Sequence, residues 1–419
     1  MEEFGIALTA IGALVLVLGL LSIPIERFPL LSRPIIALGL GILIGPDGLG
    51  WVNPLLWGSE PKYPNKVIEE LSRLTIGIAL MGVALRIPPG YFKKNIKTMF
   101  GLLGLGMAWM WLSASVLMHW VSGLPLTLSF LIGTVVTPTD PILSSTAVTG
   151  KVAEENLPER VRYAISAEAG ANDGLASVFL FLPLLLLTRA TSSDSLREWF
   201  LKSLVWENLG GALFGLALGV LIGRALVFAE KRQYLEKSSL LAYTLALTFL
   251  TLGFVQLIGM NSILAVFLAG IGFDHAVGER NREEEEGVQE AVNQFFTVPI
   301  FAVFGLSLPW REWFEMGWEA LLLVTLILFF RRLPGILIFG RFIPALRSLK
   351  DRAFAGWFGP IGVAALYYAS LAYGQTENRE IWVISSLVIF SSVLVHGVSG
   401  TPLTRLYGKQ DQLVPLGSR

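Results

Sequence analysis

The chain has 419 residues, of which 53% are hydrophobic and only 15% charged, and its mean hydropathy is +0.63. Because charged residues make up about 25% of an ordinary soluble protein, this composition excludes a soluble globular protein and indicates an all-α polytopic membrane protein. The net charge is zero, which argues against nucleic acid as a partner. With no cysteine, the chain has neither disulfides nor thiolate metal sites, and no cofactor is expected.

The membrane spans can be counted from the apolar stretches, since about 20 apolar residues cross the hydrocarbon core of a bilayer. Thirteen such stretches are predicted in chain order. They lie at about 4–22, 34–46, 66–86, 97–121, 126–150, 159–188, 204–229, 238–258, 261–277, 288–308, 317–341, 352–373 and 380–403.

The loops between these stretches differ strongly in positive charge. If the amino terminus is outside, the inside connections and tail carry 24 Lys and Arg residues and the outside connections carry 7. Positive charge concentrates on the cytoplasmic side of membrane proteins. We therefore expect a multi-pass protein of the cell membrane, either a plasma membrane or an inner membrane, with its amino terminus outside and its carboxyl terminus cytoplasmic.

Two of the predicted spans, the fifth and the twelfth, are interrupted by helix breakers. The fifth contains Pro138 and Pro141, and the twelfth contains Gly359, Pro360 and Gly362. If spans 1–6 and 8–13 are repeats, each interrupted span is the fifth of its half, and the repeats have opposite topology. Paired interrupted helices in inverted six-helix repeats are typical of secondary transporters. The alternative is that Gly and Pro are merely tolerated in membrane helices.

The fifth span also carries a carboxylate, Asp140, inside an apolar run. Pro138 and Pro141 remove backbone donors, which leaves carbonyls near Thr137 to Asp140 without helical partners. Such carbonyls, with the hydroxyls of Thr137 and Thr139 and the Asp140 carboxylate, would form a set of hard oxygen ligands suited to an alkali cation. The alternative is a kinked structural helix with Asp140 as its capping residue.

The sixth span holds two further carboxylates, Glu168 and Asp173. Asp173 follows Glu159 by fourteen residues, which is about 21 Å along a helix and close to mid-depth. Asn172 lies about 40° from Glu168 around the helix and Asp173 about 140°, so the two carboxylates should face different neighbours. Buried carboxylates in spans are costly and usually mark ion paths.

Glu168 needs a partner of its own, and the basic residues deepest in an apolar run are Arg331 and Arg332. A buried Glu–Arg pair would be structural, since breaking it leaves an uncompensated charge. The alternative for either arginine is that its side chain extends to the cytoplasmic headgroups.

Three motifs together resemble a known family, the monovalent cation/proton antiporters of the NhaP and NHE type. They are TDP at 139–141, EAGANDG at 168–174 and GWFGPIG at 356–362. The stretches VTPTDPIL, GPIGVAALYY and VHGVSGTPL most resemble the branch that contains fungal plasma-membrane sodium/proton antiporters. Two departures stand out: Ala169 replaces a common Ser, and Ile361 replaces the Arg of a GxRG motif.

The resemblance implies a homodimer in which crossed, interrupted helices hold the ion site. Asp173 would bind cation and proton alternately, assisted by Asp140, Thr139 and Asn172, while Glu168 pairs with Arg332. It also implies one transporter domain at 1–410, with a core at about 97–190 and 317–405, a dimerisation part at about 1–90 and 238–308, and a linker helix at about 204–229. Residues 411–419 would form a short cytoplasmic tail.

The function expected is exchange of Na⁺, or of Li⁺ or K⁺, for H⁺ by alternating access, with membrane lipid as surroundings. The protein is not expected to be an enzyme, because HExxH and GxSxG motifs are absent from the sequence. A proton-gated cation channel and a symporter on the same fold are the alternatives.

Overall fold

The computed structural model describes residues 2–21, 32–57, 66–234, 240–278 and 282–412, and every regular element in these ranges is helical. In chain order the first helices are α1 (Glu2–Leu20), α3 (Arg33–Ile44), α4 (Lys66–Arg86), α5 (Tyr91–Lys94), α6 (Ile96–Met99), α7 (Met107–Ser122), α8 (Leu126–Val135), α9 (Pro141–Val148), α10 (Gly150–Asn156), α11 (Glu159–Thr188) and α12 (Ser192–Glu198). They are followed by α13 (Gly211–Lys231), α14 (Leu240–Leu257), α15 (Ser262–Val277), α16 (Arg282–Leu306), α17 (Trp310–Glu315), α18 (Trp318–Phe330), α19 (Leu333–Phe339), α20 (Leu349–Trp357), α21 (Val363–Thr376) and α22 (Arg379–Gln412). Two 3₁₀ turns, η1 (Pro54–Trp57) and η4 (Gly340–Phe342), and two π-helical stretches, η2 (Phe100–Gly106) and η3 (Trp199–Gly210), complete the set.

The all-α prediction is confirmed for the described residues, whereas the count of thirteen spans is not. By length and composition, five helical segments of the described chain can cross a membrane: Ile96–Ser122, Glu159–Thr188, Ser192–Lys231, Trp318–Phe342 and Arg379–Lys409. Other expected spans are shorter, because breaks divide them, or carry charges, as α4 does at its start. Of the expected tail, 411–419, the structure describes the first two residues, as the end of α22.

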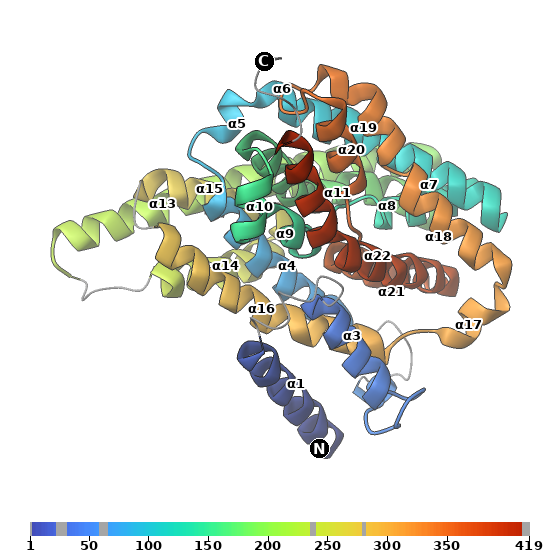
Figure 1. Ribbon diagram of the computed structural model, residues 1–419. Coiled ribbons are helices and arrows are strands. Elements are labelled where there is room, and N and C mark those ends of the chain that lie inside the picture. Colours follow the sequence, from blue (N-terminus) through green and yellow to red (C-terminus); the bar gives the residue numbers. More distant parts are fainter. Residues whose placement is uncertain (1, 22–31, 58–65, 235–239, 279–281, 413–419) are drawn as a thin grey trace.

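The helices form two groups that meet at α11. Figure 1 shows α13, α14 and α15 on one side of the molecule and α7, α8, α18 and α19 on the other, with α11 between them. Helix α13 packs along α15, and α15 packs on α4. On the other side α7 packs on α8 and on α18, while α21 packs on α22 and also on α4. The predicted core, linker and dimerisation parts stay predictions.

The contact between α13 and α15 depends on glycines at every fourth position of α13. A Cβ atom added at Gly215 would lie 2.1 Å from the carbonyl oxygen of Ala265, and one at Gly219 would lie 2.0 Å from that of Ala269. Small residues at this spacing let two helix backbones approach closely, as is common inside membranes. The sequence of α13 therefore fixes how it sits against α15.

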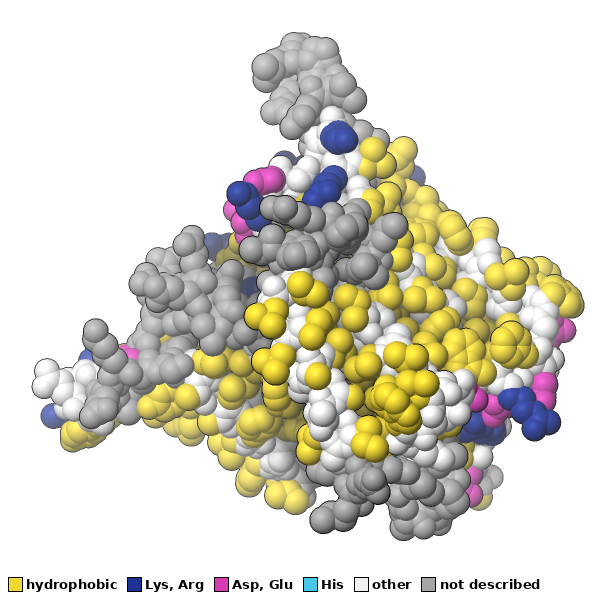
Figure 2. Space-filling view, turned by 60° about the horizontal axis from the view of Figure 1, so that its bottom comes forward, with side chains coloured by type: hydrophobic (Ala, Val, Ile, Leu, Met, Phe, Trp, Pro, Cys, Tyr) yellow, Lys and Arg dark blue, Asp and Glu magenta, His cyan; other side chains and the backbone are white. Residues whose placement is uncertain are grey.

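The surface is apolar over wide areas. Figure 2 shows apolar side chains over much of the face drawn, with Lys, Arg, Asp and Glu at its edges. Large side chains such as Leu257 and Leu321 are 85% and 72% exposed. Soluble monomers rarely expose such broad apolar areas, so this surface fits a lipid-facing exterior.

A buried ionic cluster fixes the start of α20, just before the expected twelfth span. The Asp351 carboxylate is fully buried and accepts from Arg160 at 2.7 Å, from the Tyr407 hydroxyl and from the Ser348 N–H at 2.8 Å. Burial acts to raise the pKa of Asp351, but these three hydrogen bonds outweigh it and hold the pKa below its ordinary value. The cluster joins α11, α20 and α22 close to the first half of an interrupted helix.

The close contact between α13 and α15 yields a stability prediction. Replacing Gly219→Ala should destabilise the fold by about 1–3 kcal/mol, because the new methyl group must push α13 away from α15. The matched control is Gly253→Ala in α14, where an added Cβ meets nothing within 4 Å. Thermal unfolding in detergent measures both, and equal melting temperatures for the two variants would contradict the packing described.

Candidate functional site

Two interrupted helices cross at the centre of the candidate site. Helices α8 and α9 are separated by residues 136–140, and α20 and α21 by residues 358–362. The Asp140 N–H donates to the Pro360 carbonyl at 2.8 Å, which joins the two breaks directly. Gly362 permits this approach, since a Cβ there would lie 2.2 Å from the Asp140 carboxylate. The breaks fall where the prolines in the sequence predict them.

Asp140 caps the amino ends of α9 and α21, the helices that follow the two breaks. One of its carboxylate oxygens, Oδ1, accepts from the N–H groups of Ile142 at 2.7 Å and Leu143 at 3.0 Å, at the start of α9. The other, Oδ2, accepts from the Val363 N–H at the start of α21. Helix amino ends carry partial positive charge that a carboxylate stabilises. The capping role that the sequence left as an alternative is therefore present, and a role of Asp140 in binding an ion stays a prediction.

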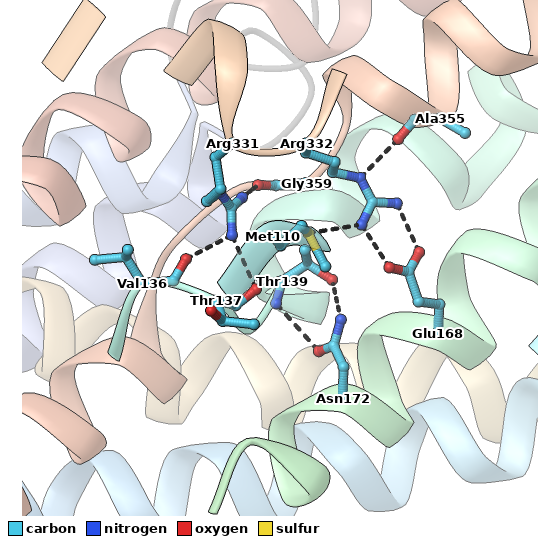
Figure 3. Close-up of polar contacts among 10 residues, drawn as sticks. All are labelled: Met110, Val136, Thr137, Thr139, Glu168, Asn172, Arg331, Arg332, Ala355 and Gly359. Carbon is cyan, nitrogen blue, oxygen red and sulfur yellow. Dashed lines mark hydrogen bonds and ion pairs between the residues drawn. The ribbon is translucent and has the colours of Figure 1, made fainter. Parts of the chain in front are cut away.

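Arg331 binds the carboxyl ends of α8 and α20, the helices that precede the two breaks. Its guanidinium donates to the carbonyls of Val136 at 2.5 Å and Thr137 at 2.9 Å, after α8, and to that of Gly359, after α20. Only 3% of Arg331 is exposed, so the alternative of an arginine that extends to the headgroups is wrong. Figure 3 shows Arg331 reaching toward both chain breaks.

The oxygens of Thr137 already take part in hydrogen bonds. Its carbonyl accepts from Arg331 at 2.9 Å and its hydroxyl donates to the Gly133 carbonyl at 2.7 Å. Both oxygens keep further lone pairs, and the place of Thr137 among the cation ligands stays a prediction. The 24 basic residues assigned to the inside connections and tail include Arg331 and Arg332, which are both buried inside the fold. The predicted orientation therefore depends on the remaining residues and stays a prediction.

Arg332 holds Glu168 in a bidentate ion pair. The two N–O distances are 2.5 and 2.6 Å, and the side chains are 2% and 1% exposed. The Arg332 Nε also donates to the Ala355 carbonyl at 2.8 Å, which ties α11 to α20. Figure 3 shows Arg332 and Arg331, adjacent in sequence, pointing to different partners. The break that presents them follows from Pro334, at the start of α19.

Asn172 joins α11 by hydrogen bonds to the break at residues 136–140. Its Oδ1 accepts from the Thr139 N–H at 3.1 Å and its Nδ2 donates to the Thr139 hydroxyl at 2.7 Å. Both residues are buried. Asn172 and Thr139 are thus brought together as the sequence predicts, and each is held by the other.

Asp173 differs from its neighbours because both oxygens of its carboxylate are buried without a hydrogen-bond partner among the described residues. The residue is 1% exposed. The Tyr368 hydroxyl, from α21, donates to the Asp173 backbone carbonyl at 2.5 Å and so fixes the main chain there. Sequence reasoning missed Tyr368, and its place in GPIGVAALYY, eight residues after Pro360, is the only signal it offered.

The site resembles no resident metal centre. Within the described ranges no three His, Cys, Asp or Glu side chains are grouped so that they could hold a metal ion. Among the buried acids of this site that the structure describes, Asp173 alone has a carboxylate without a hydrogen-bond partner, because Glu168 pairs with Arg332 and Asp140 accepts from backbone N–H groups. A carboxylate in that position requires a proton or a cation for neutrality.

Comparisons with known proteins show the family of the chain. A sequence model of the family described as "Sodium/hydrogen exchanger, transmembrane" matches residues 12–406. The chain is 30% identical to "Na(+)/H(+) antiporter 2" of Zygosaccharomyces rouxii, over 94% of this chain and 52% of that protein. It is 31% identical to the "Na(+)/H(+) antiporter" of Schizosaccharomyces pombe, over 86% of this chain and 81% of that protein. The chain spans about half the length of the first of these relatives.

A solved structure shares the fold. The sodium proton antiporter MjNhaP1 from Methanocaldococcus jannaschii aligns with a TM-score of 0.71 at 18% identity, and the alignment covers 97% of this chain and 99% of that one. At this identity the likeness is one of fold.

The buried ion pair yields a second stability prediction. Arg332→Met should destabilise the fold by about 3–5 kcal/mol, because it leaves Glu168 charged and unpaired in an apolar interior. Adding Glu168→Leu to that variant should recover much of the loss. The matched control is Arg311→Met, whose partner Glu315 is exposed and whose loss should change little. Thermal unfolding in detergent distinguishes these outcomes, and a double variant less stable than Arg332→Met alone would contradict the pairing.

Proposed function

Because the chain belongs to the sodium/hydrogen exchanger family, we propose that it exchanges a monovalent cation for a proton across a membrane, with Asp173 as the group that carries either ion. The observation that carries the proposal is the buried Asp173 carboxylate, which has no hydrogen-bond partner among the described residues. Na⁺ is the proposed cation, and Li⁺ and K⁺ are its competitors.

Exchange follows from competition at one carboxylate. A charged Asp173 in this interior is costly to maintain, so the loaded forms are those with a proton or a cation bound. A site that crosses the membrane barrier only when loaded carries one ion in one direction and the other ion back. The hydrogen bond from Tyr368 to the Asp173 carbonyl keeps the carboxylate at a fixed position for both ions.

The remaining residues have supporting roles in this proposal. Asn172 and Thr139 bind each other and hold α11, which carries Asp173, against the first chain break. Asp140 adds negative charge nearby while its oxygens cap two helices. Cation coordination then uses Asp173 together with water, main-chain oxygens and the lone pairs left on Asp140, Thr139 and Thr137.

Alternating access would come from movement of the core, at about 97–190 and 317–405, against a dimerisation part at about 1–90 and 238–308. The separation of the two helix groups in Figure 1 supports this division. A homodimer in the cell membrane, with the amino terminus outside, is part of the same proposal.

Neutralising the carrier carboxylate should abolish exchange. In liposomes that contain a pH-sensitive dye, addition of Na⁺, Li⁺ or K⁺ to the wild type should move protons, whereas Asp173→Asn should respond as protein-free liposomes do. The control Asp194→Asn, at an exposed position of α12, should behave as the wild type. Full proton flux in Asp173→Asn would overturn the assignment, and cation flux without coupled proton movement would indicate a channel.

The pH dependence follows from the same competition. As the pH falls, the proton occupies Asp173 more often, so the apparent KM for the cation should rise, by about tenfold per pH unit once protons predominate. The maximal rate at saturating cation should change much less. Initial rates measured over a grid of pH and cation concentration check this, and a KM independent of pH would show that the ions bind at separate sites.

A further inference from the structure

A second polar cluster involves Gly174 and Ser177 of α11, within one helical turn of Asp173. The Asn261 amide nitrogen lies 2.9 Å from the Gly174 carbonyl, 2.8 Å from the Ser177 hydroxyl and 2.8 Å from the Asn208 Oδ1. Ser177 in turn donates to Asn208 at 2.7 Å or to Gly174 at 2.9 Å. Ser177 and Asn208 are 4% and 3% exposed.

The cluster joins three parts of the chain that the proposed function treats as separate. Gly174 and Ser177 belong to α11 of the core, directly after the carrier residue. Asn208 lies in η3, where the linker helix begins, and Asn261 precedes α15 of the dimerisation part. Each part contributes a side chain to the cluster, and Gly174 adds a main-chain carbonyl of the core.

The local geometry of η3 presents these groups. A π-helical stretch has i→i+5 hydrogen bonds, and such stretches occur frequently at functional sites. The Asn261 N–H donates to the Glu207 carbonyl at 2.9 Å, and the Asn208 amide donates to the Ser203 carbonyl at 2.7 Å. The π stretch ends at Gly210, and the α-helix that packs on α15 starts at Gly211. The cluster therefore lies at the point where the chain changes its packing partner, because η3 packs on α11 of the core and α13 packs on α15.

The hydrogen bonds of Asn261 are divided between its own helix and the core. Its Oδ1 accepts from Ile263 and Leu264 at 3.1 Å each, which caps α15. Its amide has two hydrogens for three acceptors, so it can exchange partners as the core moves. Displacing α11 along α15 would separate Asn261 from Gly174 and Ser177.

We propose that Ser177, Asn208 and Asn261 form a latch between the core and the dimerisation part, which stabilises the conformation seen here and must open in each transport cycle. This inference rests on the proposed function, because it requires that the core move. Buried polar side chains that lose partners in an apolar interior are costly, so the latch favours one facing state over the other.

The first test uses the two faces of the membrane. Ser177→Ala and Asn208→Leu should shift the balance between facing states by about threefold to tenfold, given the strength of such bonds in membranes. The apparent KM for the cation should then rise on one face and fall on the other, since it depends on the fraction of sites exposed there. Right-side-out and everted membrane vesicles measure the two values.

The control for that test is Ser391→Ala, whose hydroxyl bonds the Leu387 carbonyl in its own helix at 2.9 Å. It should leave both values unchanged. If Ser177→Ala and Asn208→Leu change neither KM, or change both in the same direction, the latch is wrong, because a binding or folding defect affects both faces alike.

The second test exploits the absence of cysteine from the sequence. In the pair Ser177→Cys with Asn261→Cys, a short bifunctional methanethiosulfonate should link the two thiols and slow exchange at least about tenfold, and a reductant should restore the rate of the untreated pair. Each single cysteine variant, treated with the same reagent, should exchange at its untreated rate. A linked pair that exchanges at its untreated rate would contradict the latch, as would a pair in which the reagent links no thiols.

Failure of the latch and failure of the proposed function are distinguishable. If the wild type moves no protons with any cation, the proposed exchange is wrong, although linkage of the two thiols still reports the contact between α11 and Asn261. If the wild type exchanges ions while the variants show no opposite shifts in KM, the latch alone is wrong.

Discussion

Two helices that break inside an apolar interior leave N–H and C=O groups without partners, and each such group costs free energy if nothing binds it. Here two buried charges bind them. Arg331 donates to the free carbonyls at the carboxyl ends of α8 and α20. Asp140 accepts from the free N–H groups at the amino ends of α9 and α21. Each charge faces the helix ends of opposite partial charge. The crossing that positions Asn172 and Asp173 depends on these two residues.

The pairing of the other charges determines which carboxylate is left available. Glu168 is neutralised by Arg332, and the oxygens of Asp140 are bound to backbone N–H groups. Asp173 alone among these acids lacks a partner within the described part of the chain. The other buried acids of this site have partners among the described residues, which leaves the Asp173 carboxylate as the group on which the proposed exchange depends.

Much of this could be predicted from the sequence, because the informative residues interrupt an otherwise apolar chain. The family was recognised from three short motifs and is confirmed, and the ion pair between Glu168 and Arg332 is present. The role of Arg331 could not be predicted, since it depends on a carbonyl 195 residues away in sequence. The same holds for the second break, where Ile361 stands in place of the Arg of the GxRG motif. Arg331, which follows α18, binds the Gly359 carbonyl of that break. Tyr368 could not be predicted for the same reason, since the Asp173 carbonyl that it binds is 195 residues away in sequence.

The most direct measurement of the central claim is the number of protons released when the cation binds. Isothermal titration of Na⁺ into the detergent-solubilised protein, repeated in buffers of different ionisation enthalpy, gives that number without any transport. If Asp173 is shared by the two ions, about one proton should leave for each cation bound at a pH where the site is protonated, and Asp173→Asn should release none. Saturable cation binding to the wild type with no proton released would contradict the account.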